Sequence, residues 1–254
     1  MGSDSLRIGC VQYLNARPLI HGWPGKVTFD HPAALCARLA AGELDVALVS
    51  SFEFLRNPTY SIVDGVSISS DGPVYSVVVA HHGDIRAIEE IELDAASVTS
   101  VNLLRGLLAR LGLNPRLISG SEPMQLNRAR LLIGDQAIRF RQQHPELCYW
   151  DLGEEWKKLV DRPFVYALWL IRPEVIFVKN IADRLRALRD KNLAELDQLI
   201  ALEKGFDHAF CAHYYLDHLR FGFGEKEKEG LRMFKGLCAK RGLLPSPELQ
   251  LTLF

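Results

Sequence analysis

Short apolar runs alternate with helical patterns in the first part of this chain, and that alternation limits the folds open to it. Residues 6–13 and 45–49 have the composition of buried strands. Between them, residues 33–41 are rich in helix formers, with Pro32 suited to the first turn of a helix and Gly42 to its end. A strand, a helix and a second strand in this order are typical of a right-handed βαβ unit. The chain is therefore predicted to be an α/β protein with parallel strands.

The same alternation continues past the middle of the chain, and the last part has helical patterns alone. Residues 100–111 are predicted to form an amphipathic helix, because apolar residues recur at helical spacing along one face. A chain of 254 residues is long enough for one large domain or for two lobes. We expect two α/β lobes, the first formed by residues 1–75 together with 172–254 and the second by residues 76–171.

The charge balance and the cysteine content exclude several classes of protein. Thirty basic residues against 31 acidic ones leave a net charge of −1, without the basic excess typical of nucleic-acid binders. Five cysteines with no CxxC pair argue against a disulfide framework and favour a reducing compartment. The longest apolar run, residues 164–171, is far shorter than the roughly 20 residues of a membrane span. The first residues lack the apolar core of a secretory signal, so we expect a cytoplasmic protein that binds neither nucleic acid nor a membrane.

The sequence motifs of several common enzyme and nucleotide-binding classes are absent. GxxxxGK[ST], GxGxxG after a strand, HExxH and GxSxG do not occur. Three histidines, His208, His213 and His218, follow one another at five-residue spacing. Five residues advance an α-helix by about 500°, so neighbouring histidines would lie roughly 140° apart and share no face. We therefore expect no metal site here.

The first candidate functional segment follows the first predicted strand and contains Asn15. The carboxamide of this residue offers both a hydrogen-bond donor and an acceptor, which suits a ligand with hydroxyl or carboxylate groups. Ligands of α/β proteins bind at the ends of strands, where Asn15 is expected. The structural alternative is that Asn15 caps the turn before Pro18. The residues around it leave both interpretations open.

Two hydroxyl-rich segments stand where a predicted strand meets a predicted helix. Ser50 and Ser51 follow one of the buried strands, and Thr99 and Ser100 begin the predicted amphipathic helix. Hydroxyls and free backbone N–H groups at such a junction form an anion site, although each pair also fits a simple helix cap. With one pair in each lobe, the two helix starts are predicted to hold an anionic ligand between them. The dipole of each helix would add about 0.3–1 kcal/mol.

A polar turn and a carboxylate at another strand end complete the candidate segments. The turn contains Ser70, Gly72 and Ser76, and it is expected either to line a cleft or to form a hinge between the lobes. Asp135 follows a predicted strand, where it would either receive a hydroxyl of the ligand or fix a neighbouring loop. Glu53 is a possible acid or base, or a residue that favours the helix dipole.

These segments, taken in order, carry a resemblance to a known family. They are Ile8-Gly9 through Tyr13-Leu14-Asn15 and Pro18-Leu19, Gly42 to Ala47 with Ser50-Ser51-x-Glu53, Ser67 to Ser76, Thr99-Ser100, Leu132 to Asp135, Asp151 to Trp156, Arg162 to Trp169 and Gly230 to Phe234. The sequence resembles the MqnA family, the chorismate dehydratases of the futalosine route to menaquinone. The likeness covers essentially the whole chain. Phe54 stands where the family often has a tyrosine.

The resemblance implies a two-lobe, periplasmic-binding-protein-like fold of type II, with a cleft between the lobes, in a cytoplasmic enzyme. It implies a lyase that dehydrates chorismate to 3-[(1-carboxyvinyl)oxy]benzoate without a metal or organic cofactor. The residues expected to bind this small dianion are Ser50, Ser51, Ser70, Gly72, Ser76, Thr99, Ser100 and Asp135. Two other functions stay open, because a fold does not determine a function. They are a small-anion solute-binding protein and the related cyclase that acts later in the same pathway.

For this reaction, Asn15 is the predicted catalytic residue and the proton acceptor is left open. The proton would leave the ring carbon that bears the enolpyruvyl ether, and hydrogen bonds to the ring carboxylate would stabilise the developing charge. Glu53 and Asp135 are the candidate bases among the residues. The alternative is that the substrate's own enolpyruvyl carboxylate takes the proton while Asn15 and the serines hold it.

Overall fold

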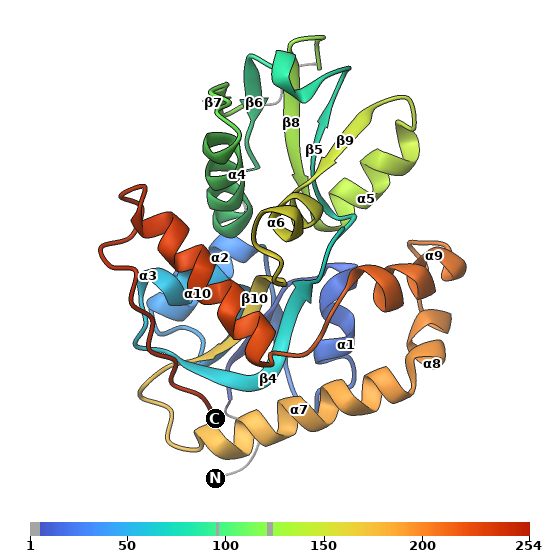
Figure 1. The fold of residues 1–254 in the computed structure, drawn as a ribbon. Coiled ribbons are helices and arrows are strands. Elements are labelled where there is room, and N and C mark those ends of the chain that lie inside the picture. Colours follow the sequence, from blue (N-terminus) through green and yellow to red (C-terminus); the bar gives the residue numbers. More distant parts are fainter. Residues whose placement is uncertain (1–5, 95–96, 121–123) are drawn as a thin grey trace.

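The computed structural model describes residues 6–94, 97–120 and 124–254, and the strands of these residues form two separate sheets (Figure 1). In order across the first sheet, the strands are β2 (Val27–Phe29), β1 (Ile8–Cys10), β3 (Val46–Ser50), β10 (Phe164–Ile171) and β4 (Ser61–Ser70). Strand β1 runs parallel to β2 and β3, as the βαβ pattern predicted. Strand β10 lies antiparallel between β3 and β4.

The second sheet repeats this arrangement. In order across it, the strands are β7 (Arg116–Ile118), β6 (Glu90–Glu92), β8 (Arg128–Ile133), β5 (Val77–His81) and β9 (Cys148–Asp151). Strand β6 is parallel to β7 and β8, and β5 is antiparallel to β8 and β9. Each sheet therefore has three parallel strands, then one antiparallel strand, then an outer strand. The two lobes therefore share an architecture, although the sequence shows no internal repeat from which it could be predicted.

The chain passes between the sheets twice among the described residues, and one boundary differs from the prediction. The first passage lies between Ser70, the end of β4, and Val77, the start of β5. The second lies between β9 and β10, because β10 pairs with β3 and β4. The assignment of residues up to 171 to the second lobe is therefore wrong for β10. Its apolar run shows a central strand, but an apolar run does not say which sheet it enters.

Helices cover the sheets and connect their strands. They are η2 (Leu14–Ala16), α1 (Arg17–Ile20), α2 (Pro32–Ala40), α3 (Ser51–Arg56), η3 (Ile85–Ala87), α4 (Val98–Arg110), α5 (Gly134–Gln143), α6 (Leu152–Val160), α7 (Val178–Ala194), α8 (Leu196–Ala201), α9 (His208–His213), the π-helical turn η4 (Tyr214–His218) and α10 (Glu225–Ala239). Helix α10 packs against β10 of the first lobe and α4 of the second. Within the described ranges, no helix has the length and apolarity that crossing a bilayer requires.

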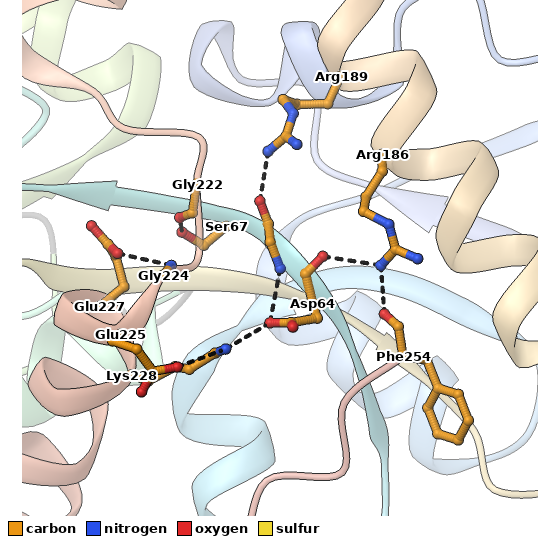
Figure 2. A network of polar contacts seen from close by, with 11 residues as sticks. Asp64, Ser67, Arg186, Arg189, Gly222, Gly224, Glu225, Glu227, Lys228 and Phe254 are labelled. Carbon is orange, nitrogen blue, oxygen red and sulfur yellow. Dashed lines mark hydrogen bonds and ion pairs between the residues drawn. The ribbon is translucent and has the colours of Figure 1, made fainter.

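A polar network ties the helical last part of the chain to the first sheet (Figure 2). Strand β4 contains a bulge at which Gly65 takes a φ of +76°, a value that favours glycine. Arg189 of α7 donates to the carbonyl of Gly65 at 2.6 Å, and Arg186 donates to the carbonyl of Asp64 at 3.1 Å. The Asp64 carboxylate pairs with Lys228 of α10 at 3.0 Å. These contacts hold α7 and α10 against the first sheet, so the last part of the chain belongs to the same lobe as the first part.

Candidate active site

A cavity lies between the two sheets and receives side chains from both lobes. Its free volume, counting the open side, is about 600 Å³. Aliphatic side chains form much of the wall. The polar side chains that line it are Tyr13, Asn15, Ser50, Ser76, Ser97, Thr99, Ser100 and Tyr166. Among the described lining residues there is no Lys, Arg, Asp or Glu. Any charge on a ligand would therefore be met by hydroxyl, amide and backbone donors.

The two predicted helix starts meet in this cavity. The hydroxyl of Ser50, at the end of β3, forms a hydrogen bond with the hydroxyl of Thr99 in the first turn of α4. The backbone N–H of Phe52 also donates to Thr99 Oγ1, at 3.0 Å. Ser51 does not line the cavity; its hydroxyl lies 3.5 Å from Thr99 Oγ1 and donates to the carbonyl of Val165 at 2.7 Å. The structure thus places Ser50 and Thr99 in the cavity wall, while Ser51 secures α3 to β10.

Helix α4 begins at a serine that the sequence analysis missed. The N-cap was expected at Thr99 or Ser100, but Ser97 takes that position and its Oγ accepts from the backbone N–H of Ser100 at 3.2 Å. The Ser97 hydroxyl also donates to Ser100 Oγ at 2.7 Å. The signal was in the sequence, since an N-cap serine bonds a backbone N–H two or three residues later. Ser97 and Ser100 both line the cavity.

Asn15 reaches the cavity from the loop after β1, in the turn η2. Its Oδ1 is buried and has no hydrogen-bond partner among the described residues. The alternative in which this oxygen caps the turn before Pro18 is therefore wrong. A buried oxygen without a partner costs free energy, about 1–3 kcal/mol for a typical polar group. Such an atom in a cavity wall indicates a position where a ligand supplies the missing donor.

Of Ser70, Gly72 and Ser76, the residues of the polar turn that were predicted to bind the ligand, only Ser76 lines the cavity. Ser76 is fully buried and accepts a hydrogen bond from the Tyr214 hydroxyl at 2.6 Å. Ser70 lies at the first passage between the lobes, where its hydroxyl donates to the carbonyl of Gly72 at 3.0 Å and lies 3.1 Å from the hydroxyl of Tyr166. The structure thus places Ser70 and Gly72 at the passage between the lobes and outside the cavity lining, and the hinge stays a prediction.

Asp151 holds the two passages between the lobes together, a role that the sequence analysis did not assign. Its carboxylate accepts from the backbone N–H groups of Val74 and Tyr75 at 3.1 and 2.8 Å. It also accepts from those of Gly153 and Glu154 at the start of α6, at 3.0 and 3.2 Å. Burial raises the pKa of the Asp151 carboxyl, and these four backbone donors oppose the shift. The sequence feature that could have indicated this role is an aspartate directly before a predicted helix, where it can act as an N-cap.

Neither candidate base lines the cavity. Asp135 stands in the first turn of α5, and its Oδ1 accepts from the backbone N–H of Leu14 at 2.7 Å. Burial raises the pKa of the Asp135 carboxyl, and the Leu14 donor opposes that shift. Of the two roles predicted for Asp135, the structure shows the fixing of a loop, the one that carries Asn15. Glu53 is buried beside Arg56, with which it forms an ion pair.

The histidine series contains one pair that the α-helical spacing did not predict. The rings of His213 and His218 lie with their centroids 4.9 Å apart. Residues 214–218 form a π-helical turn, whose hydrogen bonds join residues five apart and bring them to one side. The prediction that these two share no face is therefore wrong. Within the described residues, no group of three His, Cys, Asp or Glu is placed to hold a metal ion.

Comparisons with known proteins place this geometry in a family. The model of a family described as menaquinone biosynthesis matches residues 6–240. A chorismate dehydratase from Thermus thermophilus is 29% identical, over 89% of this chain and 93% of that protein. A structural-genomics protein from Archaeoglobus fulgidus has a TM-score of 0.70 at 16% identity, over 94% of this chain and 98% of that one. The periplasmic aliphatic sulphonate-binding protein of Escherichia coli has a TM-score of 0.63 at 16% identity, over 98% and 93%. The chain has the predicted two-lobe fold of periplasmic binding proteins, and it belongs to the menaquinone biosynthesis family, the MqnA family.

Proposed function

We propose that this protein is a chorismate dehydratase, a lyase that forms 3-[(1-carboxyvinyl)oxy]benzoate and water in the futalosine route to menaquinone. The observation that carries the proposal is the cavity between the lobes, lined with hydroxyl groups and one unpartnered amide oxygen, in a chain of this family. The relative from Thermus thermophilus supports the choice of reaction. A reducing, cytoplasmic location stays a prediction.

The donors of the cavity suit the carboxylates of chorismate. In the structure, the hydroxyls of Ser50 and Thr99 bond each other across the lobes. A substrate carboxylate placed between them would accept a hydrogen bond from each, and from the backbone N–H of Phe52 that Thr99 now receives. A hydrogen bond to a charged group contributes about 1.5–3 kcal/mol, so a few of them account for micromolar affinity. The aliphatic wall would face the ring.

The same donors would stabilise the charge that forms during dehydration. Removal of the proton from the ring carbon bearing the enolpyruvyl ether leaves a pair of electrons conjugated with the ring carboxylate. Donors already directed at that carboxylate gain strength as its charge grows, which lowers the barrier. Hydroxide then leaves the adjacent carbon and combines with the removed proton as water, and the ring becomes aromatic. The protein supplies orientation and charge stabilisation for both steps.

The position of the carboxylates in the fold favours the substrate as its own base. Glu53 and Asp135 lie outside the cavity lining, in an ion pair and in a bond to Leu14. The enolpyruvyl carboxylate of chorismate lies close to the proton that must be removed. Once this carboxylate has taken the proton it becomes an O–H donor, and the ring hydroxyl is another. Either group satisfies Asn15 Oδ1, and a bond that forms only after proton transfer favours the reaction itself.

Incubation with chorismate tests the function. We expect an aromatic product that has lost one water molecule, detected by its absorbance and by mass spectrometry, and much slower formation of this product when Asn15→Ala replaces the wild-type protein. Binding of chorismate without turnover, measured by calorimetry, would instead identify a solute-binding protein. The absence of both binding and turnover would favour the later cyclase of the pathway.

A further inference from the structure

The loop that carries Asn15 is attached to the other lobe at the first two residues of α5. The turn η2 follows β1 of the first lobe, and it packs against α5 of the second. The residues of α5 that meet this loop are Gly134 and Asp135. The backbone N–H of Leu14 donates to Asp135 Oδ1 at 2.7 Å, and the ring of Tyr13 lies against Gly134. A hydrogen bond and a ring contact therefore join the loop to the second lobe.

The ring contact depends on the absence of a side chain at Gly134. A Cβ at this position would lie 2.9 Å from Cδ2 and 3.0 Å from Cγ of Tyr13, whereas carbon atoms in good contact lie about 3.5–4.0 Å apart. These atoms belong to the part of the ring nearest its own backbone, so the collision is relieved only if the whole ring leaves its place or the loop shifts. The N–H of Gly134 donates to the carbonyl of Ser76 at 2.8 Å, which holds the glycine in position.

Backbone conformation is a second reason for glycine at this position, and it can be separated from the first. Gly134 has a φ of +57°, a value that favours glycine whatever surrounds it. Gly83 has nearly the same φ, +61°, but a Cβ there would meet no other part of the described chain within 4 Å. Gly83 lies in an exposed turn after β5, outside the cavity lining. An alanine at Gly83 therefore strains the backbone alone, whereas an alanine at Gly134 also meets the ring.

The contact bears on the reaction because the same loop forms part of the cavity wall. Tyr13, Asn15 and Gly134 all line the cavity, and Tyr13 is partly exposed as well, so its side chain belongs to the rim. Leu14 stands between Tyr13 and Asn15, and the Tyr215 hydroxyl donates to its carbonyl at 2.9 Å. A displacement of the ring would therefore reach Asn15 through a short segment that has little freedom to absorb it.

We propose that Gly134 is a positioning residue for the dehydration: its lack of a side chain lets the Tyr13 ring rest on the second lobe, which keeps the Asn15 carboxamide at the reacting atoms. This inference rests on the proposed function. A side chain at Gly134 would shift Asn15 relative to the substrate, and a misplacement of about 1 Å can cost two orders of magnitude in rate. Ser50 and Thr99, the proposed carboxylate donors, belong to other elements and keep their places, so the substrate would still bind.

Gly134→Ala is the direct test, and Gly83→Ala is its matched control. We expect kcat of Gly134→Ala to fall about 10- to 100-fold while KM changes little. Gly83→Ala introduces alanine at nearly the same φ without a collision, so its thermal unfolding midpoint should fall while its kcat stays at the wild-type value. A wild-type kcat in Gly134→Ala, or an equal loss of kcat in Gly83→Ala, would overturn the inference.

A double-mutant cycle with Tyr13→Ala shows whether the ring transmits the effect. Because Tyr13→Ala lacks the ring, adding Gly134→Ala to it should lower kcat little further. Equal fold losses with and without the ring would overturn the inference, because Gly134 would then act through α5 alone. If Gly134→Ala does not fold by itself, we expect the double variant to fold, since the collision is gone. An unfolded double variant would overturn the inference as well.

Turnover of chorismate by the wild-type protein is measured first. Its absence would overturn the proposed function and, with it, this inference. Turnover by the wild-type protein together with unchanged kinetics of Gly134→Ala would overturn this inference alone.

Discussion

The two lobes have the same strand order, but they present their helix starts to the cavity in different ways. In the second lobe, α4 has thirteen residues and is capped by Ser97, from its own lobe. In the first lobe, α3 has six residues and no side-chain cap of its own. The backbone N–H of Phe52 in α3 finds its acceptor on Thr99, across the cavity. The first turn of α4 thus receives its side-chain acceptor from its own lobe, whereas the first turn of α3 receives its acceptor from the other lobe.

This difference bears on how the two helix starts would receive a ligand. The Thr99 hydroxyl occupies the position where an oxygen of a ligand would accept from α3 and Ser50. A carboxylate entering that position would replace one neutral hydroxyl with a charged acceptor, and hydrogen bonds to charged acceptors are the stronger ones. Asn15, by contrast, has no partner at Oδ1 among the described residues, so the contacts between the lobes do not satisfy this oxygen. Thr99 is therefore suited to binding and Asn15 to the reaction.

The largest effect is expected from Asn15→Ala, which removes the amide group that the first lobe is proposed to supply to the reaction. Loss of a preorganised polar group at the reacting centre lowers kcat about 100- to 1,000-fold. Steady-state kinetics with chorismate should show this fall with a smaller change in KM. Asn57→Ala, at the end of α3 in the same lobe, is the control and should turn over normally. Near-normal turnover by Asn15→Ala would reject its catalytic role.

Thr99→Val should have the next largest effect, because it removes the hydroxyl that spans the lobes and keeps the shape of the side chain. Ser50 and the N–H of Phe52 lose their shared partner, and the substrate loses one donor. We expect kcat/KM to fall about 10- to 100-fold, in line with one hydrogen bond to a charged group. Thr99→Ser keeps the hydroxyl and should stay close to wild type. Equal losses in both variants would show that packing, rather than the hydroxyl, is responsible.

Ser97→Ala tests the helix start of the second lobe, as Thr99→Val tests the contact between the lobes. It removes the internal cap of α4, which typically costs about 1 kcal/mol of stability. The midpoint of thermal unfolding should therefore fall in Ser97→Ala, while kcat/KM should fall less than in Thr99→Val. A wild-type midpoint in Ser97→Ala, or a fall in kcat/KM as large as in Thr99→Val, would contradict the division between a helix start capped within its own lobe and one completed by the other lobe.

Local patterns made much of the fold predictable, and with it five of the eight polar side chains that line the cavity. The β3–α3 and α4 junctions follow from periodicity and from hydroxyl residues at strand ends, so Ser50 and Thr99 could be named before the structure. Ser97 was within reach of the capping rule and was misplaced by two or three residues. Element existence is encoded over a few neighbouring residues, and this is the part that sequence patterns report well.

The remaining features depend on contacts between distant parts of the chain. Tyr214 reaches Ser76 from 138 residues away, and the π-helical turn that carries it has no local signature that distinguishes it from an α-helix. The antiparallel place of β10 follows from its pairing partners rather than from its apolar run. Asp135 has the same limitation: the pattern placed it at a strand end, but its contact with Leu14 lies across the lobes.

Asp135→Asn tests the contact between Asp135 and Leu14, and of the variants discussed it is expected to change turnover least. The substitution keeps an acceptor oxygen for the Leu14 N–H and removes the charge. Because neither Asp135 nor Glu53 lines the cavity, we expect turnover of chorismate to stay close to wild type. Glu53→Gln should behave likewise in the same assay. A large fall in kcat with Asp135→Asn, at an unchanged KM, would restore this carboxylate as the base.

The stability of Asp135→Asn should differ from wild type in a pH-dependent way. Burial raises the pKa of the Asp135 carboxyl above its ordinary value of 3.8, so the folded protein binds this proton more tightly than the unfolded chain. Wild-type stability therefore falls as the pH rises from that value through the folded pKa. The variant lacks this loss, so its thermal unfolding midpoint should exceed that of wild type at about pH 7 and approach it at about pH 4. Asp84→Asn, at an exposed turn, is the control. The opposite result would be a wild-type midpoint that exceeds the variant's, with a larger excess at about pH 7 than at about pH 4. It would show that the ionised carboxylate stabilises the contact between Asp135 and Leu14, and with it the association of the two lobes.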